Sequence, residues 1–150
     1  MKPLIVLGIA FVLALAGTRF TLGHIDYNLS GRIAISVMLV FTGIAHFVYT
    51  RGMAMMLPDI VAFRQLLVIV TGLIEITAPI GLLIPSFTRS TGLLLMLFFM
   101  LLLPANIYAA LHRIDYQTSS HDGYGVGYLW VRVPLQLFFM IWVYLVAVHR

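Results

Sequence analysis

The sequence predicts an all-α integral membrane protein, a helical bundle of four core transmembrane helices with a fifth helix at the N-terminus. Of its 150 residues, 62% are hydrophobic and only 9% are charged, and the mean hydropathy is +1.06. A water-soluble domain usually carries about 25% charged residues. Since about 20 apolar residues cross a bilayer as a helix, the length fits four or five crossings in a single transmembrane domain, residues 1–150.

The first apolar run, residues 3–18, lies between Lys2 and Arg19. It is shorter than a typical crossing, and we expect a tilted or partly interfacial N-terminal helix. Ala14 and Ala16 after a basic start also fit a secretory signal with a small-residue cleavage site, so this alternative stays open.

Four further apolar runs form the expected core, residues 31–149. Ser30 is the expected N-cap of the first of these runs, and Pro58 with Asp59 suits a helix start near Asp59 for the next. Pro104 marks an expected kink, and tyrosines and tryptophans anchor the last run at the membrane interfaces. The four runs cover residues 33–49, 66–85, 91–111 and 128–148.

The longest connection, residues 113–127, is polar and rich in turn residues. It is long enough to fold back as a lid, and a simple connector is the alternative. The orientation in the membrane is not predicted, because five crossings place four basic residues on each side and the positive-inside rule gives a tie. These residues are Lys2, Arg51, Arg64 and Arg113 on one side and Arg19, Arg32, Arg89 and Arg150 on the other.

Ionisable side chains within the apolar runs are the candidate functional residues. Each costs about 2.5 to 3.5 kcal/mol at the centre of a membrane span, so His46, Glu75 and Arg132 should face the bundle interior. Other polar residues lie four positions away on the same helix faces: Thr42, Thr71 and Gln136.

Consecutive spans run in opposite directions, which places all these polar residues, together with Asn106 and Tyr108, in one half of the bilayer. The sequence therefore predicts a polar cavity open to one side. A neutral Glu75 would donate a proton to a carbonyl group, and an ionised one would accept a proton or bind a cation. The candidate catalytic residues are Glu75, His46 and Arg132, and the candidate ligand-binding residues are Thr71, Asn106, Tyr108 and Gln136. The alternative is that these residues only tie helices together.

Composition also excludes several kinds of chemistry. The chain contains no cysteine, which rules out disulfides, thiolate nucleophiles and iron–sulfur clusters. No metal site is expected, and no cofactor is identified. The net charge of +4 is scattered along the chain, so no nucleic-acid-binding surface is expected. Gly43 and Gly72 are expected to let helices approach closely.

A series of motifs resembles the DoxX-like membrane proteins over residues 33–144. The resemblance implies a four-helix membrane core, with residues 3–18 as an addition. It also places His46, Glu75, Asn106, Arg132 and Gln136 at the polar positions of that family. The motifs are, in order, FTGIAHF at 41–47, MLP at 56–58, EI at 75–76, GLLIP at 81–85, PANIY at 104–108 and LWVRVPLQ at 129–136.

Two functions follow as hypotheses for this multi-pass protein, whose expected location is the cell membrane. The first is a half-membrane polar pocket that binds or acts on a small lipophilic molecule, quinone-like or lipid-like. The second is a non-catalytic accessory subunit or assembly factor of a membrane redox complex. The DoxX-like name comes from a subunit of a thiosulfate:quinone oxidoreductase, but without cysteine this chain is not expected to transfer sulfur. Whether the protein is an enzyme stays open.

Overall fold

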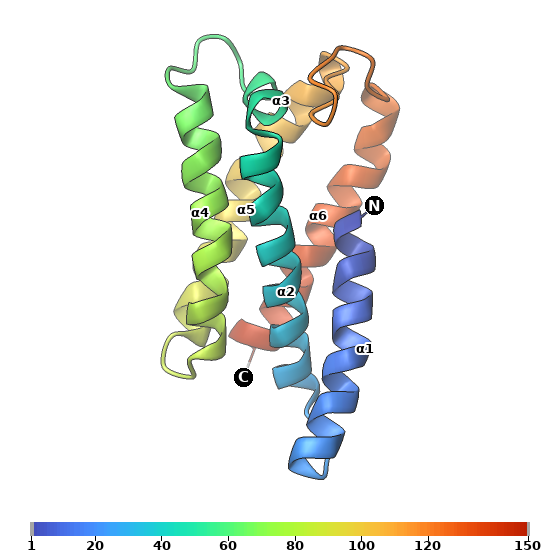
Figure 1. Ribbon diagram of the computed structural model, residues 1–150, viewed down its shortest axis with the longest axis vertical. Coiled ribbons are helices and arrows are strands. Elements are labelled where there is room, and N and C mark those ends of the chain that lie inside the picture. Colours follow the sequence, from blue (N-terminus) through green and yellow to red (C-terminus); the bar gives the residue numbers. More distant parts are fainter. Residues whose placement is uncertain (1, 150) are drawn as a thin grey trace.

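The computed structural model describes residues 2–149, so Arg150, one of the basic residues counted above, lies outside the described residues. Every regular element in this part of the chain is a helix (Figure 1), which confirms the all-α prediction. Five helices are long and apolar enough to cross a bilayer, and the protein is a multi-pass membrane protein. They are α1 (Lys2–Leu22), α2 (Tyr27–Val48), α4 (Arg64–Leu83), α5 (Thr88–Leu111) and α6 (Leu129–Val143), the last preceded by a 3-10 turn, η1 (Val126–Tyr128), and followed by a π-helical turn, η2 (Tyr144–Val148).

Helix α2 begins earlier than the sequence predicted. Asp26 is its N-cap, and its carboxylate accepts a hydrogen bond from the Leu29 amide at 2.9 Å. An aspartate oxygen satisfies one of the free amides at a helix start as well as a serine does. The prediction of Ser30 as the N-cap was therefore wrong. Ser30 instead lies inside the helix, buried, with its hydroxyl oxygen 3.2 Å from that of Thr18.

The predicted start of α4 near Asp59 was also wrong, since the helix begins at Arg64. Phe63, directly before it, has a left-handed backbone with φ 56°. The Asp59 carboxylate accepts a hydrogen bond from the Arg64 guanidinium at 2.6 Å across the turn, instead of lying in the first turn of the helix. The linker before this turn forms an additional short helix, α3 (Thr50–Met55), which the sequence did not predict.

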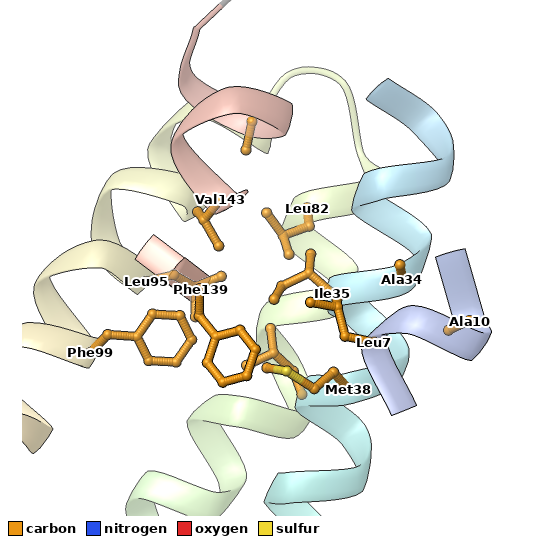
Figure 2. Close-up of a cluster of buried hydrophobic side chains, with 12 residues drawn as sticks. Leu7, Ala10, Ala34, Ile35, Met38, Leu82, Leu95, Phe99, Phe139 and Val143 are labelled. Atoms are coloured by element: carbon orange, nitrogen blue, oxygen red, sulfur yellow. The ribbon is translucent and has the colours of Figure 1, made fainter. Parts of the chain in front are cut away.

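The apolar core occupies the half of the bundle that lies away from α3. Helix α2 lies between α1 and α4 and packs against both, while α5 packs against α6 and η2 (Figure 1). The core side chains of α2 follow helical spacing on one face. Figure 2 shows this cluster, which includes Leu7, Ile35, Met38, Leu82, Leu95, Phe99, Phe139 and Val143.

Helix α1 is staggered relative to the other long helices. It lies beside the first part of α2, its N-terminal end is about half-way up the bundle, and its C-terminal end projects beyond α4 and α5 (Figure 1). Its buried residues Leu7, Ala10, Ala14 and Thr18 recur every three or four positions, which is the spacing of one helix face. Phe11 packs edge-to-face against Trp142, with ring centroids 4.9 Å apart.

Candidate functional site

Two glycines allow α2 and α4 to approach closely where they cross. A Cβ atom added to Gly43 would lie 3.0 Å from the carbonyl oxygen of Gly72, and one added to Gly72 would lie 3.1 Å from that of Gly43. These distances are tighter than ordinary van der Waals contact, so the prediction that these glycines permit close helix approach is confirmed. The residue three positions after each glycine is thereby brought to the crossing: His46 on α2 and Glu75 on α4.

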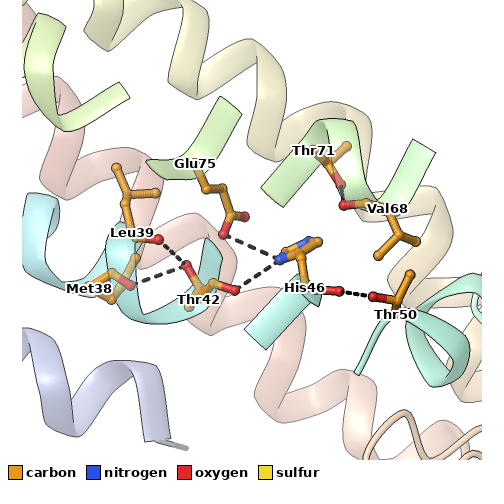
Figure 3. Close-up of polar contacts among 8 residues, drawn as sticks. All are labelled: Met38, Leu39, Thr42, His46, Thr50, Val68, Thr71 and Glu75. Atoms are coloured by element: carbon orange, nitrogen blue, oxygen red, sulfur yellow. Dashed lines mark hydrogen bonds and ion pairs between the residues drawn. The ribbon is translucent and has the colours of Figure 1, made fainter. Parts of the chain in front are cut away.

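His46 and Glu75 form a buried pair (Figure 3). The Nδ1 atom of His46 lies 3.6 Å from Oε2 of Glu75, and the two side chains are 12% and 5% exposed. The same Nδ1 lies 2.9 Å from the carbonyl oxygen of Thr42. Since a carbonyl oxygen only accepts hydrogen bonds, Nδ1 must carry a hydrogen. Nδ1 donates this hydrogen to the Thr42 carbonyl and not to Glu75, because the 3.6 Å between Nδ1 and Oε2 is too long for a hydrogen bond.

The second feature of the pair is an unsatisfied oxygen. Oε2 of Glu75 is fully buried and has no hydrogen-bond partner within residues 2–149. Most buried polar atoms in proteins have a partner, and an uncompensated buried charge costs several kcal/mol. This oxygen therefore needs either a bound proton or a further donor. With the imidazole beside it, the pair has the composition of a general acid–base couple.

The threonines near the pair bond to their own helices. The Thr71 hydroxyl donates to the Val68 carbonyl at 2.9 Å, and the Thr42 hydroxyl donates to the Met38 and Leu39 carbonyls at 3.2 and 3.1 Å. Threonine in a helix commonly forms such bonds to the preceding turn. Thr71 thus lies one turn from Glu75 on α4 and is half-buried. Its hydroxyl hydrogen is already donated to the Val68 carbonyl.

Arg132 is not brought to Glu75. Its guanidinium lies over two aromatic rings, with Cζ 5.9 Å from the ring centre of Tyr116 and 5.7 Å from that of Tyr128. Cation–π contacts of this kind stabilise an arginine without a carboxylate. Neither the contact of His46 with Glu75 nor the ion pair of Arg64 with Asp59 involves Arg132.

Asn106 and Gln136 are brought to one another. Asn106 Nδ2 donates to Gln136 Oε1 at 3.0 Å, and Gln136 Nε2 donates to the carbonyl oxygen of Phe99. These bonds join α5 to α6. Tyr108, by contrast, stacks on His112 of the same helix end, with ring centroids 4.0 Å apart. The candidate residues therefore form two pairs, with Thr71, Tyr108 and Arg132 outside both.

The loop after α5 folds back onto α3. Asp115 and Ser120 exchange two backbone hydrogen bonds at 2.9 and 3.3 Å, which close a small hairpin-like turn. Tyr116, at its tip, meets Tyr49 edge-to-face with ring centroids 5.8 Å apart. Its backbone carbonyl packs directly on Gly52, where any added Cβ atom would overlap it. Arg132 thus holds this loop through the ring of Tyr116.

A family model matches residues 35–147, from α2 through most of η2. The chain belongs to this family, described as Domain of unknown function (DUF8561). The matching model is not that of the DoxX-like proteins, so the motif resemblance does not establish membership there. No curated protein and no solved structure matches the chain.

The DUF8561 match contains all seven candidate residues and both glycines of the crossing, and it leaves out α1. Two pockets lie within this part of the chain. One, of about 590 Å³, lies between α3 and the start of α4. The other, of about 190 Å³, is an apolar groove between α4 and α5. Glu75 lines neither of them, and no group of three metal-ligating side chains occurs among residues 2–149.

Sequence reasoning missed one buried charge in the DUF8561 protein, that of Arg32. The side chain is only 5% exposed, and its guanidinium donates to the Thr88 hydroxyl and to the Asn28 carbonyl, both at 3.3 Å. Arg32 was counted as a flanking charge because the apolar run was taken to begin at residue 33, directly after it. Recognising Asp26 as the cap would have placed Arg32 in the second turn of the helix, inside the bundle.

Proposed function

We propose that the DUF8561 domain binds a small lipophilic molecule, quinone-like or lipid-like, at the His46–Glu75 pair. The observation that carries this proposal is the buried Glu75 oxygen without a hydrogen-bond donor, 3.6 Å from His46. A hydroxyl group on a ligand would supply the missing donor. A carbonyl group would instead accept a hydrogen bond from a protonated Glu75.

The position of the pair supports a ligand that enters from the membrane. Glu75 lies mid-way along α4, and His46 lies in the last turn of α2, in the half of the bundle away from the apolar core. A ligand with an apolar body would lie among the helices and present one polar group to the pair. Glu75 and His46 would exchange a proton with that group, and Thr71, one turn away, would lie beside it. Under this proposal Arg132 acts on the loop above the site.

The test compares Glu75→Gln with a matched control, Asp122→Asn, which makes the same carboxylate-to-amide change in an exposed loop. Each protein is purified in mild detergent from its native membrane and examined by native mass spectrometry. We expect a co-purifying small molecule on the wild type and on the control but not on Glu75→Gln. All three should elute alike in size-exclusion chromatography. Retention of the same molecule by Glu75→Gln would sink the proposal.

A second candidate function is that of an accessory subunit in a membrane redox complex. Two contacts favour this accessory role, because in them polar residues connect one part of the bundle to another. Asn106 bonds to Gln136 between α5 and α6, and Arg132 contacts Tyr116 between α6 and the loop after α5. The motif resemblance to the DoxX-like proteins supports the same class of complex. If this second function is correct, purification from native membranes should return a partner protein in a fixed ratio. No small molecule that co-purifies with the wild type should then be lost from Glu75→Gln.

A further inference from the structure

The larger pocket, of about 590 Å³, combines basic and apolar walls. Helix α3 contributes Arg51 and Met55, and the turn and first residues of α4 contribute Phe63, Arg64 and Leu66. These two elements, α3 and the start of α4, lie at the same end of the bundle (Figure 1). The pocket is far from Glu75 along α4, since ten residues of helix, or about 15 Å, separate Gln65 in its wall from Glu75.

The charges around this pocket leave a net positive site. Arg64 donates to the Asp59 carboxylate at 2.6 Å and to the Leu57 carbonyl at 3.3 Å. Arg51 is exposed and forms no ion pair or hydrogen bond in the part of the chain that the structure describes. Two guanidinium groups and one carboxylate give a charge of +1. Each guanidinium has five N–H donors, so Arg51 and Arg64 both retain donors for an anion in the pocket.

The apolar wall of the pocket, formed by Phe63 and Leu66, lies near the boundary between lipid headgroups and acyl chains. Phe63 is 79% exposed and Leu66 is 56% exposed, and Arg64 is the first residue of a membrane-spanning helix. The pocket therefore lies at the level where phospholipid headgroups meet the hydrocarbon, and basic pockets at that level bind anionic headgroups. We infer that this pocket binds an anionic phospholipid, with its phosphate between Arg51 and Arg64 and an acyl chain along Phe63 and Leu66.

The experiment titrates the full chain, in neutral detergent, with phosphatidylglycerol or phosphatidylcholine, and counts bound lipid by native mass spectrometry. Phosphatidylglycerol should bind the wild type more tightly than phosphatidylcholine. Arg51→Gln should weaken this binding by about fivefold, the effect of one basic residue near a membrane surface. Asp59→Asn should strengthen it by a similar factor, because this change removes the negative charge beside Arg64. The matched control is Arg113→Gln, the same change at an exposed residue outside the pocket.

Several results would overturn the inference. Equal binding of both lipids would show that the pocket does not select an anionic headgroup. Equal losses in Arg51→Gln and Arg113→Gln would show a general effect of charge. If inorganic phosphate displaced phosphatidylglycerol at comparable concentration, the site would be one for free phosphate. Glu75→Gln should leave lipid binding unchanged, so this test and the test of the proposed function fail independently.

Discussion

Gln136 uses both ends of its side-chain amide inside the bundle. Its Nε2 donates to the Phe99 carbonyl, and its Oε1 accepts from Asn106 at 3.0 Å. Gln136 is only 7% exposed, so water cannot readily replace these bonds. Side-chain hydrogen bonds between membrane helices contribute about 0.6 kcal/mol on average and at most about 1.7 kcal/mol. The pair is therefore a modest but measurable tie between α5 and α6.

A double-mutant cycle with Asn106→Leu and Gln136→Leu measures this tie. We expect a coupling energy of about 0.6 kcal/mol in the free energy of unfolding. Gln136→Leu should cost more than Asn106→Leu, because it also removes the bond to Phe99. Unfolding by sodium dodecyl sulfate in mixed micelles gives the four free energies. Strictly additive effects would contradict the pairing and would favour the original interpretation of both amides as ligand-binding groups.

The fates of the predicted polar residues show which contacts a sequence reveals. His46 and Glu75 both lie on helices, so span direction and depth predicted that they share one half of the bilayer. Their equal distances from Gly43 and Gly72 explain why they meet at the crossing. Arg132 also lies on a helix, but its partner Tyr116 lies in a loop. The course of a loop leaves no periodic signal, so the sequence did not reveal that aromatic rings of Tyr116 and Tyr128 would take up the Arg132 guanidinium.

At the scale of the element, the crossing of α2 and α4 depends on the absence of side chains at two positions. A Cβ atom at Gly43 would meet Ile76 Cγ1 at 2.6 Å as well as the Gly72 backbone. The isoleucine can change its rotamer. The backbone carbonyl of Gly72 can move only if α4 moves with it, and that movement would also separate His46 from Glu75.

Gly43→Ala should therefore lower the free energy of unfolding by about 1 to 3 kcal/mol, the usual cost of overpacking. Gly8→Ala and Gly17→Ala are the controls, since an added Cβ atom at either position meets nothing within 4 Å. Both controls should be neutral or stabilising, because alanine favours the helix over glycine. The same unfolding assay applies, and a Gly43→Ala protein as stable as its controls would argue against a close crossing.

The loop over α3 depends on a third glycine. The Tyr116 carbonyl packs on Gly52, and there is no room for a Cβ atom. Gly52→Ala should displace the tip of the loop and raise hydrogen exchange at the backbone amides of residues 113–127, measured by mass spectrometry. Gly127→Ala, where an added Cβ atom meets nothing within 4 Å, is the control and should leave exchange unchanged. Equal exchange in both variants would show that the loop does not depend on this contact.

Helix existence was easier to predict than helix ends. All five long helices coincide with apolar runs, because about 20 consecutive apolar residues leave few alternatives. The start of α2 was misplaced because two residues near it, Asp26 and Ser30, have suitable capping chemistry, and Asp26 is the one that caps the helix. The start of α4 was misplaced because its N-cap, Phe63, has no side chain that can cap a helix. The short helix α3 has too few residues to show a periodic pattern.

At the scale of the whole molecule, five long apolar helices that each cross the membrane would place successive turns on opposite faces. The turn between α4 and α5 contains Ser86, and the loop after α5 contains Thr118, both exposed. The chain has no cysteine, so Ser86→Cys and Thr118→Cys each introduce a unique thiol. A membrane-impermeant maleimide should label only one of the two in intact cells and both after permeabilisation. Labelling of both in intact cells would contradict the arrangement.

The stagger of α1 has a consequence for the surrounding lipid. One flat slab of hydrocarbon cannot match the apolar lengths of α1 and of the neighbouring helices, because their ends lie at different heights (Figure 1). Local bending or thinning of a bilayer costs fractions of a kcal/mol for each ångström of mismatch. A leaflet that covers the apolar part of α1 and of its neighbours would therefore deform beside α1, and membranes of different thickness would cover the apolar surface of this protein to different extents.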